Sequence, residues 1–522
     1  MGLLRAIATV GGYTAASRVL GFVRDLLTAA YLGAGPVADA FVVALRLPNL
    51  FRSLFAEGAF SAAFVPLFTA RAAAQGRAAA KAFAEDSLVL LLAALIVFVI
   101  LAEIAMPWVV AAIAPGFVQG TDRFDLAVEL TRITFPYLLF VSLVAFLGGV
   151  LNALDRFAAA AAAPILLNLA LIAALLFFAR SFATPGHALA WGVAAAGVLQ
   201  FLWLAVAAAR AGVPLSLPRP RLTPDTRRLL GLMGPGILGS GVTQINLMVS
   251  TMLASLLPSG AIAHLYYADR LNQLPLGIVG IAVATAILPR LARDLRAADP
   301  ETASRTQNRG FAFVLAIALP AAAALAILGL PIVRALFERG AFAAGDSHAT
   351  AAALAAYAAG LPAFVLARVA VTGFFAREDT RTPVRIAFAS FLVNAGLTLA
   401  LMRPLGHVGV ALATSAAGWL SIVLMLSILR RRGFWAPDAF LLRRLPRIAI
   451  ATVGMAAALL GGIWAVRAAW PGALDAAPLG PLAALGPLIA LGLAVYGALA
   501  FGLGAVTRAE LRGLGRPGRP AP

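Results

Sequence analysis

The stretch from Gly33 to Phe68 reads GAGPVADAFVVALRLPNLFRSLFAEGAFSAAFVPLF, and it is preceded by SRVLGFVRD from Ser17 to Asp25. Both stretches lie in apolar sequence that favours helices, yet they carry seven charged residues: Arg18, Arg24, Asp25, Asp39, Arg46, Arg52 and Glu57. An ionised side chain at the centre of a bilayer costs about 2.5–3.5 kcal/mol or more. These groups therefore cannot face lipid and must line a wet space, and their net positive charge favours an anionic ligand.

The rest of the chain has the composition of a membrane protein. Of its 522 residues, 62% are hydrophobic and 12% are charged, which is far from the usage of a soluble domain. A helix that crosses a bilayer needs about 20 mostly apolar residues. We predict an all-α polytopic membrane protein with about fourteen transmembrane segments, at 6–32, 37–68, 87–113, 128–151, 159–179, 188–209, 229–257, 262–289, 310–333, 350–376, 382–402, 406–429, 446–469 and 477–505.

The basic residues follow the topology of these segments. The net charge is +19, and the chain has 41 Lys and Arg residues. With the N-terminus inside, 28 of them fall in inside segments and 6 in outside loops. This bias is typical of the positive-inside rule, so we predict that both termini are cytoplasmic in a bacterial inner membrane. The excess of positive charge is explained by topology, and we expect no nucleic-acid partner.

An internal duplication is predicted from the placement of basic and proline residues. Setting Arg46 against Arg270 brings ADAFVVALRLPNL beside AHLYYADRLNQL, and with one residue deleted Pro66 then falls opposite Pro289. Both halves begin inside, so the repeats are parallel. We predict an N-terminal lobe at 1–210, a proline-rich cytoplasmic linker at 211–228, a C-terminal lobe at 229–432, two extra helices at 433–505 and a cytoplasmic tail at 506–522.

No residue pattern typical of catalysis is present. The sequence has no cysteine and only four histidines, which do not cluster, and it contains no Walker-type phosphate loop, HExxH or G-x-S-x-G motif. We therefore predict no catalytic residue, no metal site and no cofactor. The function class that remains is transport in which this chain hydrolyses nothing. Its energy source stays open, and the membrane potential or a coupled ion of unknown identity would serve.

The charged residues form stripes along helices. Eighteen residues complete five helical turns, so Asp39 and Glu57 point the same way and Arg46 and Ser53 lie on the same line. Arg18 and Asp25 share a face, whereas Arg24 lies about 120° from Arg18. Structural ion pairs of Asp25 with Arg18 and of Asp39 with Arg46 are one alternative, and snorkelling from span ends is another. Arginine suits bidentate recognition of phosphate, so a phosphate-bearing ligand is the preferred interpretation.

A second polar patch lies in the other half of the chain. Asp269 and Arg270 are followed by Asn272 and Gln273, and a structural Asp–Arg pair is the alternative there. Arg132 and Arg368 are interpreted as residues at span edges.

Four stretches resemble the MurJ/MviN family of lipid II flippases, within the multidrug/oligosaccharidyl-lipid/polysaccharide exporter superfamily. They are SRVLGFVRD, the 33–68 stretch quoted above, YYADRLNQLPLGIVGIAVATAILP at 266–289 and FFAREDTRTPVR at 374–385. The resemblance implies two pseudo-symmetric lobes around a central cationic cavity. It also implies transport of undecaprenyl-diphosphate-linked disaccharide-pentapeptide from the inner to the outer leaflet by alternating access, for peptidoglycan synthesis and cell shape.

The resemblance also implies roles for individual residues. The diphosphate-binding residues would be Arg18, Arg24, Arg52 and Arg270, and the extra helices would form a groove for the lipid tail. The resemblance also places Asp25 and Asp39 nearby in the cavity, and from the polar residues around them we add Ser17, Arg46, Asn49, Ser53, Glu57 and Asp269 as candidate cavity and gating residues. Expected partners are the lipid-linked precursor, membrane lipid and other cell-wall synthesis proteins, with a functional monomer. The alternatives are a flippase for another polyprenyl-diphosphate oligosaccharide, a cation-coupled multidrug exporter of the same superfamily, and a non-transporting scaffold.

Overall fold

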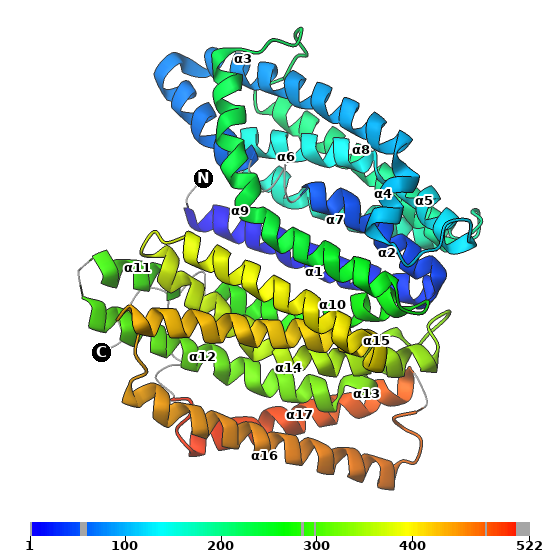
Figure 1. Cartoon of the computed structure of the whole chain (residues 1–522), viewed down its shortest axis with the longest axis vertical. Coiled ribbons are helices and arrows are strands. Elements are labelled where there is room, and N and C mark those ends of the chain that lie inside the picture. Colours follow the sequence, from blue (N-terminus) through cyan, green and yellow to red (C-terminus); the bar gives the residue numbers. More distant parts are fainter. Residues whose placement is uncertain (1–2, 53–59, 283–286, 297–298, 476–477, 508–522) are drawn as a thin grey trace. The chain divides into compact units, whose positions relative to one another are not determined.

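The computed structural model describes residues 3–52, 60–282, 287–296, 299–475 and 478–507, and every regular element in them is a helix (Figure 1). A π-helical turn, Ala174–Phe178, extends α7. The α-helices are α1 Leu3–Leu32, α2 Pro36–Phe51, α3 Ser61–Ile104, α4 Met106–Ile113, α5 Asp122–Thr134, α6 Tyr137–Ala153, α7 Phe157–Ala173, α8 Pro185–Arg210, α9 Pro224–Ser255, α10 Ala261–Ala282, α11 Leu288–Arg296, α12 Pro300–Ile327, α13 Gly329–Phe337, α14 Ala344–Phe375, α15 Arg381–Arg431, α16 Ala439–Ala469 and α17 Leu479–Gly502.

The prediction of an all-α polytopic membrane protein is confirmed. Nine helical segments of the described residues are long and apolar enough to cross a membrane. One of them, α15, has 51 residues and bends at Gly406, where φ is +57°. Glycine adopts this left-handed conformation without a steric penalty, and the bend separates the predicted segments 382–402 and 406–429. The total of fourteen segments stays a prediction.

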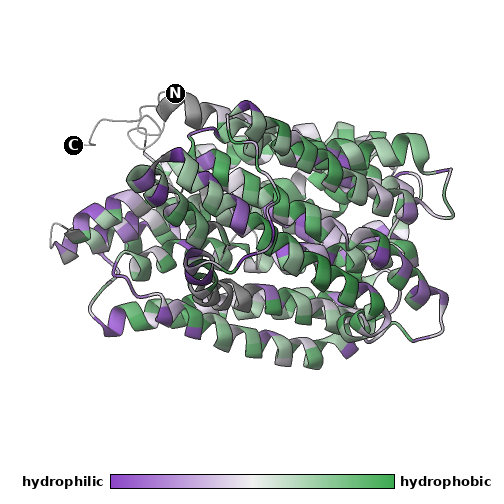
Figure 2. Cartoon of the chain, turned by 90° about the horizontal axis from the view of Figure 1, so that it is seen from above, coloured by the Kyte–Doolittle hydropathy of each residue, from purple (hydrophilic) through white to green (hydrophobic). Residues whose placement is uncertain are grey.

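Hydropathy varies along the helices as a bilayer requires (Figure 2). Hydrophobic residues line the middle of the helices, and hydrophilic residues gather at many helix ends and connections. Large apolar side chains are also exposed, among them Leu101 on α3 and Val453 and Trp464 on α16. So many exposed large apolar side chains are unfavourable in water, and lipid is the solvent that accommodates them.

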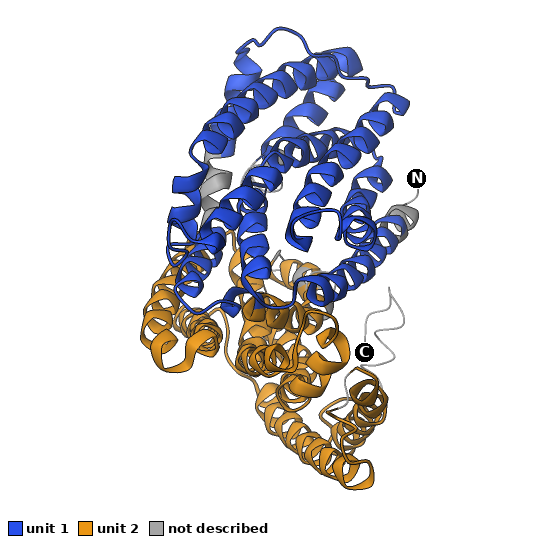
Figure 3. Cartoon of the chain, turned by 90° about the vertical axis from the view of Figure 1, so that its right-hand side faces the viewer, with its two compact units in different colours: residues 1–263 blue, residues 264–522 orange. Residues whose placement is uncertain are grey.

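Residues 1–263 form the first of two compact units (Figure 3). Its core contains a group of stacked and tilted phenylalanine rings, with Phe64 in contact with Phe60, Phe83 and Phe146. Helix α9 belongs to this unit because the backbone of its last turn lies against Gly116, where a Cβ atom would come within 2.1 Å of the Ser255 carbonyl oxygen. The lobe boundaries at 211–228 stay a prediction.

A proline in α2 is compensated by a neighbouring helix of the same unit. Pro48 has no N–H to donate to the carbonyl of Ala44 four residues earlier. The hydroxyl of Thr134, at the end of α5, donates to that carbonyl at 3.2 Å. The hydrogen bond that the proline removes from α2 is thus replaced by one that joins α2 to α5.

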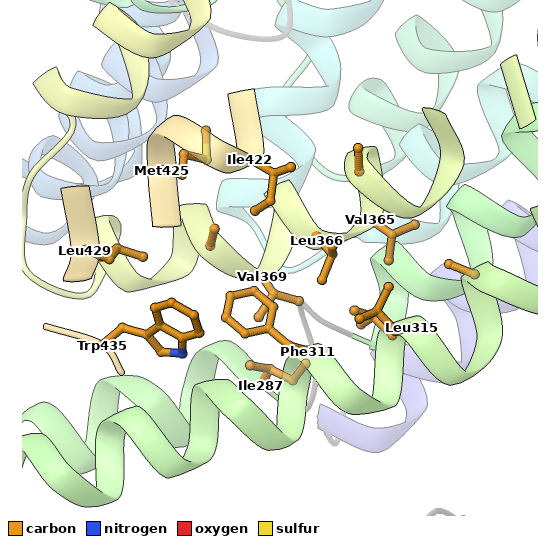
Figure 4. Packing of buried hydrophobic residues seen from close by; sticks show 14 of the residues in the cluster. Ile287, Phe311, Leu315, Val365, Leu366, Val369, Ile422, Met425, Leu429 and Trp435 are labelled. Carbon is orange, nitrogen blue, oxygen red and sulfur yellow. The ribbon is translucent and has the colours of Figure 1, made fainter. Parts of the chain in front are cut away.

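Residues 264–522 form the second unit. Its main core lies between α12, α14 and α15 and closes on Trp435 (Figure 4). The Trp435 ring meets the Phe311 ring edge-on at 5.7 Å between centroids, and its Nε1–H donates to Asn308 Oδ1 at 2.7 Å. The polar atom of this large side chain is therefore satisfied inside the core.

Helices α16 and α17 pack against each other and against α12 and α13 of the second unit. Met455, Leu459 and Leu488 are buried in this contact. Here too a proline leaves a carbonyl without its helical donor, because Pro320 of α12 cannot donate to Ala316. The Tyr496 hydroxyl of α17 donates to that carbonyl at 2.6 Å, so the hydrogen bond fixes α17 on α12.

Candidate functional site

Arg24 of α1 is held in place by a carboxylate and an amide. Its Nε and Nη2 atoms lie 3.1 and 2.6 Å from Oδ1 of Asp25, and its Nη1 donates to Asn168 Oδ1 of α7 at 3.0 Å. Asn168 in turn donates to the backbone oxygen of Ser17 at 3.0 Å. The Arg24 side chain is 18% exposed. This cluster of Ser17, Arg24, Asp25 and Asn168 therefore fixes the direction of one guanidinium group.

Gly21 of α1 lies beside this cluster, at the contact with α7. A Cβ atom at that position would lie 3.6 Å from Nδ2 of Asn168, so α1 and α7 approach closely where the amide crosses between them. Sequence reasoning missed Asn168, because a single amide in an apolar helix carries no pattern. Its only sequence signal is that a polar amide inside an apolar segment needs a partner.

Arg18 lies apart from the Arg24 cluster. Its side chain is exposed, as are the neighbouring Ala16 and Val19 on α1. The alternative in which Arg18 pairs with Asp25 is not what the structure contains, since Asp25 pairs with Arg24. Adjacent residues on a helix do not face each other, but the long Arg24 side chain folds back to reach the carboxylate.

Asp39, in the first turn of α2, is completely buried and accepts three hydrogen bonds. Its Oδ2 atom lies 2.6 Å from Arg123 Nη2 and 2.7 Å from the Gly260 nitrogen, and its Oδ1 atom lies 2.8 Å from the Ala263 nitrogen. The last two donors belong to the start of α10, where backbone N–H groups lack helical partners and attract negative charge. Asp39 therefore joins α2 to the N-terminus of α10.

The alternative of an Asp39–Arg46 pair is wrong. The two residues are about two helical turns, or roughly 10 Å, apart along α2, and the nearer Arg123 of α5 occupies the carboxylate. The Arg123 guanidinium also lies 4.0 Å from the centroid of the Phe117 ring. The sequence predicts Arg123 to lie in an outside loop, between the predicted segments 87–113 and 128–151. Helical spacing compares residues of one helix, so it could not identify Arg123 as the partner of Asp39.

The C-terminal part of α2 and the residues that follow it carry the remaining predicted site residues of the first unit. Asn49 donates to the Leu45 carbonyl at 2.9 Å, and Arg52 Nε lies 3.4 Å from Asn49 Oδ1. Arg46 and Arg52 are half-buried. Ser53 and Glu57 lie outside the described residues, so the stripe predicted from Asp39 to Glu57 is traced only as far as Arg46.

In the second unit, Asp269 and Arg270 lie on α10. The Arg270 guanidinium stacks on the Tyr266 ring at 4.6 Å from its centroid, and Gln273 Nε2 donates to Asp269. Arg368 of α14, interpreted from sequence as an edge residue, has an exposed side chain. A Cβ atom added at Gly280 would lie only 2.2 Å from Nη1 of Arg368. The Arg368 guanidinium of α14 therefore packs directly against the α10 backbone at this glycine.

Sequence comparison identifies the family. The model of the lipid II flippase MurJ family matches residues 28–473. The chain belongs to the MurJ family of lipid II flippases. It is 46% identical over 518 residues to a probable lipid II flippase MurJ of Rhizobium meliloti, covering 98% of this chain and 96% of the relative. It is 38% identical over 509 residues to the lipid II flippase MurJ of Burkholderia cenocepacia, covering 96% and 97%.

Solved structures with the same fold include a MurJ flippase and more distant transporters. A lipid II flippase MurJ in an inward closed conformation has a TM-score of 0.77 at 24% identity, and 97% of this chain and 99% of that chain are covered. An inward-facing multidrug resistance transporter of the MATE family and MOP superfamily has a TM-score of 0.69 at 15% identity, covering 80% and 94%. The chain therefore shares the fold of both of these solved transporters.

Proposed function

We propose that this chain carries lipid II, the lipid-linked peptidoglycan precursor, from the inner to the outer leaflet of the bacterial inner membrane by alternating access. The MurJ family relationship over nearly the whole chain supports the substrate class. The basic residues on α1, α2 and α10 support the same conclusion. Guanidinium groups bind phosphate through paired hydrogen bonds, and charged groups in a membrane-spanning region are costly unless they serve a function of this kind. The activity is transport, without a catalytic step.

The observation that carries the proposal is the arrangement around Arg24. A guanidinium fixed by Asp25 and Asn168 is already oriented, so a phosphate that binds it loses less side-chain entropy than it would on a mobile arginine. Arg18 and Arg52 add positive charge from the first unit, and Arg270 adds it from the second. These four residues are the proposed diphosphate contacts.

Asp39 is the proposed gating residue. It binds the free N–H groups of α10 in the structure, and a substrate can change the conformation only if it binds one state more tightly than another. Release of the α10 N-terminus from Asp39 is a change that binding energy of this kind can drive. We propose that Arg46, Asn49, Ser53, Glu57 and Asp269 line the path of the headgroup.

The topology, the lobe bounds and the monomer belong to the same proposal and rest on the sequence alone. Both termini are cytoplasmic, the lobes span 1–210 and 229–432 around the 211–228 linker, and a monomer is the working unit. Helices α16 and α17 expose Leu460, Leu482 and Leu493 while their inner faces pack on α12 and α13. We propose this apolar hairpin as the surface that accommodates the polyprenyl tail.

The test replaces Arg24 by Ala and measures how much lipid II headgroup reaches the outer leaflet of reconstituted vesicles. The matched control is Arg305→Ala, because Arg305 is an exposed arginine in a simple pair with Glu301 on α12. We expect Arg24→Ala to lose at least about tenfold in rate, the equivalent of one charge-assisted hydrogen bond, and Arg305→Ala to remain normal. Equal rates for wild type and Arg24→Ala at equal protein levels would contradict the proposed role.

The substrate itself is tested by native mass spectrometry of the purified protein with its co-isolated lipid. A mass equal to lipid II supports the proposal. A different polyprenyl-diphosphate oligosaccharide, or a cationic drug without lipid, would assign the chain to one of the two alternative classes.

A further inference from the structure

The first unit contains a cavity whose lining includes none of the proposed diphosphate-binding residues. It has a volume of about 740 Å³ and lies between α5, α8 and the connection that precedes α8. Its polar and aromatic lining includes Asp125, Glu129, Arg132, His187, Phe182 and Trp191. On the predicted topology, the 114–121 and 179–184 connections that flank these helices are outside loops, so the cavity opens near the outer surface of the membrane.

The charges in this cavity are ordered along α5. Asp125, Glu129 and Arg132 follow at intervals of four and three residues, which places them on one face of the helix. All three are exposed, whereas Ala127 and Leu130 on the opposite face are completely buried. Two carboxylates therefore lie nearer the outer end of α5, and one guanidinium lies about 10 Å from Asp125, deeper along the helix.

Neighbouring groups hold these charges in place without enclosing them. His187 Nε2 lies 3.2 Å from Glu129 Oε2, and His187 Nδ1 lies 2.9 Å from the Thr184 hydroxyl. The Glu129 side chain is still 62% exposed, so its carboxylate remains open to a ligand. Arg132 also interacts electrostatically with Glu103 of α3.

The aromatic residues place the cavity at a lipid interface. Trp191 is 53% exposed and Phe182 is 38% exposed, although both line the cavity. Tryptophan is enriched at the level of lipid headgroups, and an exposed indole face also attracts an ammonium group. A ligand of this site therefore has an apolar part, a cationic part and an anionic part.

We propose that this cavity binds the headgroup of an outer-leaflet phospholipid that carries a primary ammonium, such as phosphatidylethanolamine. The ammonium donates to Asp125 and Glu129 beside Trp191, the phosphate lies against Arg132, and the acyl chains follow the apolar surface of α8. An anionic lipid such as phosphatidylglycerol lacks the ammonium and is repelled by the carboxylates. Phosphatidylcholine carries a charge but no N–H to donate.

The experiment is native mass spectrometry of the full chain, released from nanodiscs that contain equal amounts of phosphatidylethanolamine, phosphatidylglycerol and phosphatidylcholine. We expect the wild type to retain phosphatidylethanolamine above its share. The double variant Asp125→Asn with Glu129→Gln should reduce that enrichment about tenfold, as expected when charge-assisted hydrogen bonds are lost, and Arg132→Gln should also reduce it. Because these side chains are exposed, the variants should fold normally, which thermal unfolding verifies.

The control variant Glu301→Gln removes an exposed carboxylate of α12 that lies in the other unit. It should retain the wild-type enrichment. A second readout uses phosphatidylethanolamine with brominated acyl chains. These chains should quench the tryptophan fluorescence of the wild type more than that of the Trp191→Phe variant. Retention of all three lipids in proportion to the mixture, or undiminished enrichment in the double variant, would overturn the proposal. Neither measurement depends on flipping, so this inference can fail while the proposed function stands.

Discussion

Replacement of Asp39 by asparagine tests the contact between α2 and α10. The carboxylate accepts from Arg123, Gly260 and Ala263 at 2.6–2.8 Å and is completely buried. Asparagine has nearly the same shape but only one acceptor oxygen, so its NH₂ group must face at least one N–H donor. The variant also leaves Arg123 without its counter-charge.

The expected cost follows from these contacts. Breaking a buried ion pair by removing one partner costs about 3–5 kcal/mol. The Arg123 side chain is 17% exposed, so water recovers part of this loss, and we expect the free energy of unfolding to fall by about 3 kcal/mol. The assay is denaturant unfolding of the purified protein in detergent. The matched control is Asp225→Asn, because Asp225 also lies in the first helical turn and pairs with an arginine, Arg71, but is 41% exposed; its loss should stay below about 1 kcal/mol.

A labelling experiment separates local opening from global stability. The chain has no cysteine, so a single Ala261→Cys substitution, at a position that is 5% exposed, reports only on the start of α10. Maleimide should react faster with this cysteine in the Asp39→Asn background. The reasoning is refuted if Asp39→Asn leaves both the labelling rate and the unfolding free energy unchanged, or if it costs as much in an Arg123→Gln background as it does alone.

Three further outcomes follow from individual contacts. Asn168→Leu should lower lipid II transport by less than Arg24→Ala does, since Arg24 keeps Asp25, and equal loss in the vesicle assay would contradict this. Tyr496→Phe should lower the free energy of unfolding by about 1 kcal/mol through the lost hydrogen bond to the Ala316 carbonyl, measured by denaturant titration. Hydrogen bonds from Thr382 and Arg432 lower the pKa of Asp379 to about 2; because the unfolded value is about 3.9, its stabilisation is complete above roughly pH 5 and is lost as the pH falls toward 2. The thermal midpoint of Asp379→Asn should therefore fall less than that of the wild type between about pH 5 and pH 2, as measured by thermal unfolding at a series of pH values. An equal fall in both proteins would contradict the lowered pKa of Asp379.

The helical architecture was predictable because its causes are local. Apolar length fixes which segments can cross a membrane, and single residues such as Gly406 and Pro48 mark where a helix bends or loses a hydrogen bond. The angular separation of Arg18 and Arg24 on an ideal helix was also informative, since one side chain is exposed and the other is held against α7. Residue spacing along one helix is enough for statements of this kind.

The partners of the charged residues were not predictable for the same reason. Asp39 binds backbone N–H groups 221 and 224 residues later in the chain, and a backbone donor leaves no mark in the amino-acid sequence. Asn168 lies 144 residues from Arg24. Helical spacing therefore favoured nearby pairs on the same helix, whereas tertiary packing offered Asp39 three better donors from α5 and α10.

The difference between Arg18 and Arg24 bears on how a diphosphate can be bound and then released. Arg24 is oriented by Asp25 and Asn168, so in the proposed mechanism its guanidinium would bind phosphate at a small entropic cost, but Asp25 also cancels part of its charge. Arg18 is exposed and keeps its full charge, although ordering its side chain costs about 0.5–1.5 kcal/mol. A set of fully exposed arginines would bind many anions without selecting a geometry, and a set of fully paired ones would bind none tightly. In the proposed mechanism, the combination on α1 would give directional recognition together with an attraction weak enough for the headgroup to leave on the other side of the membrane.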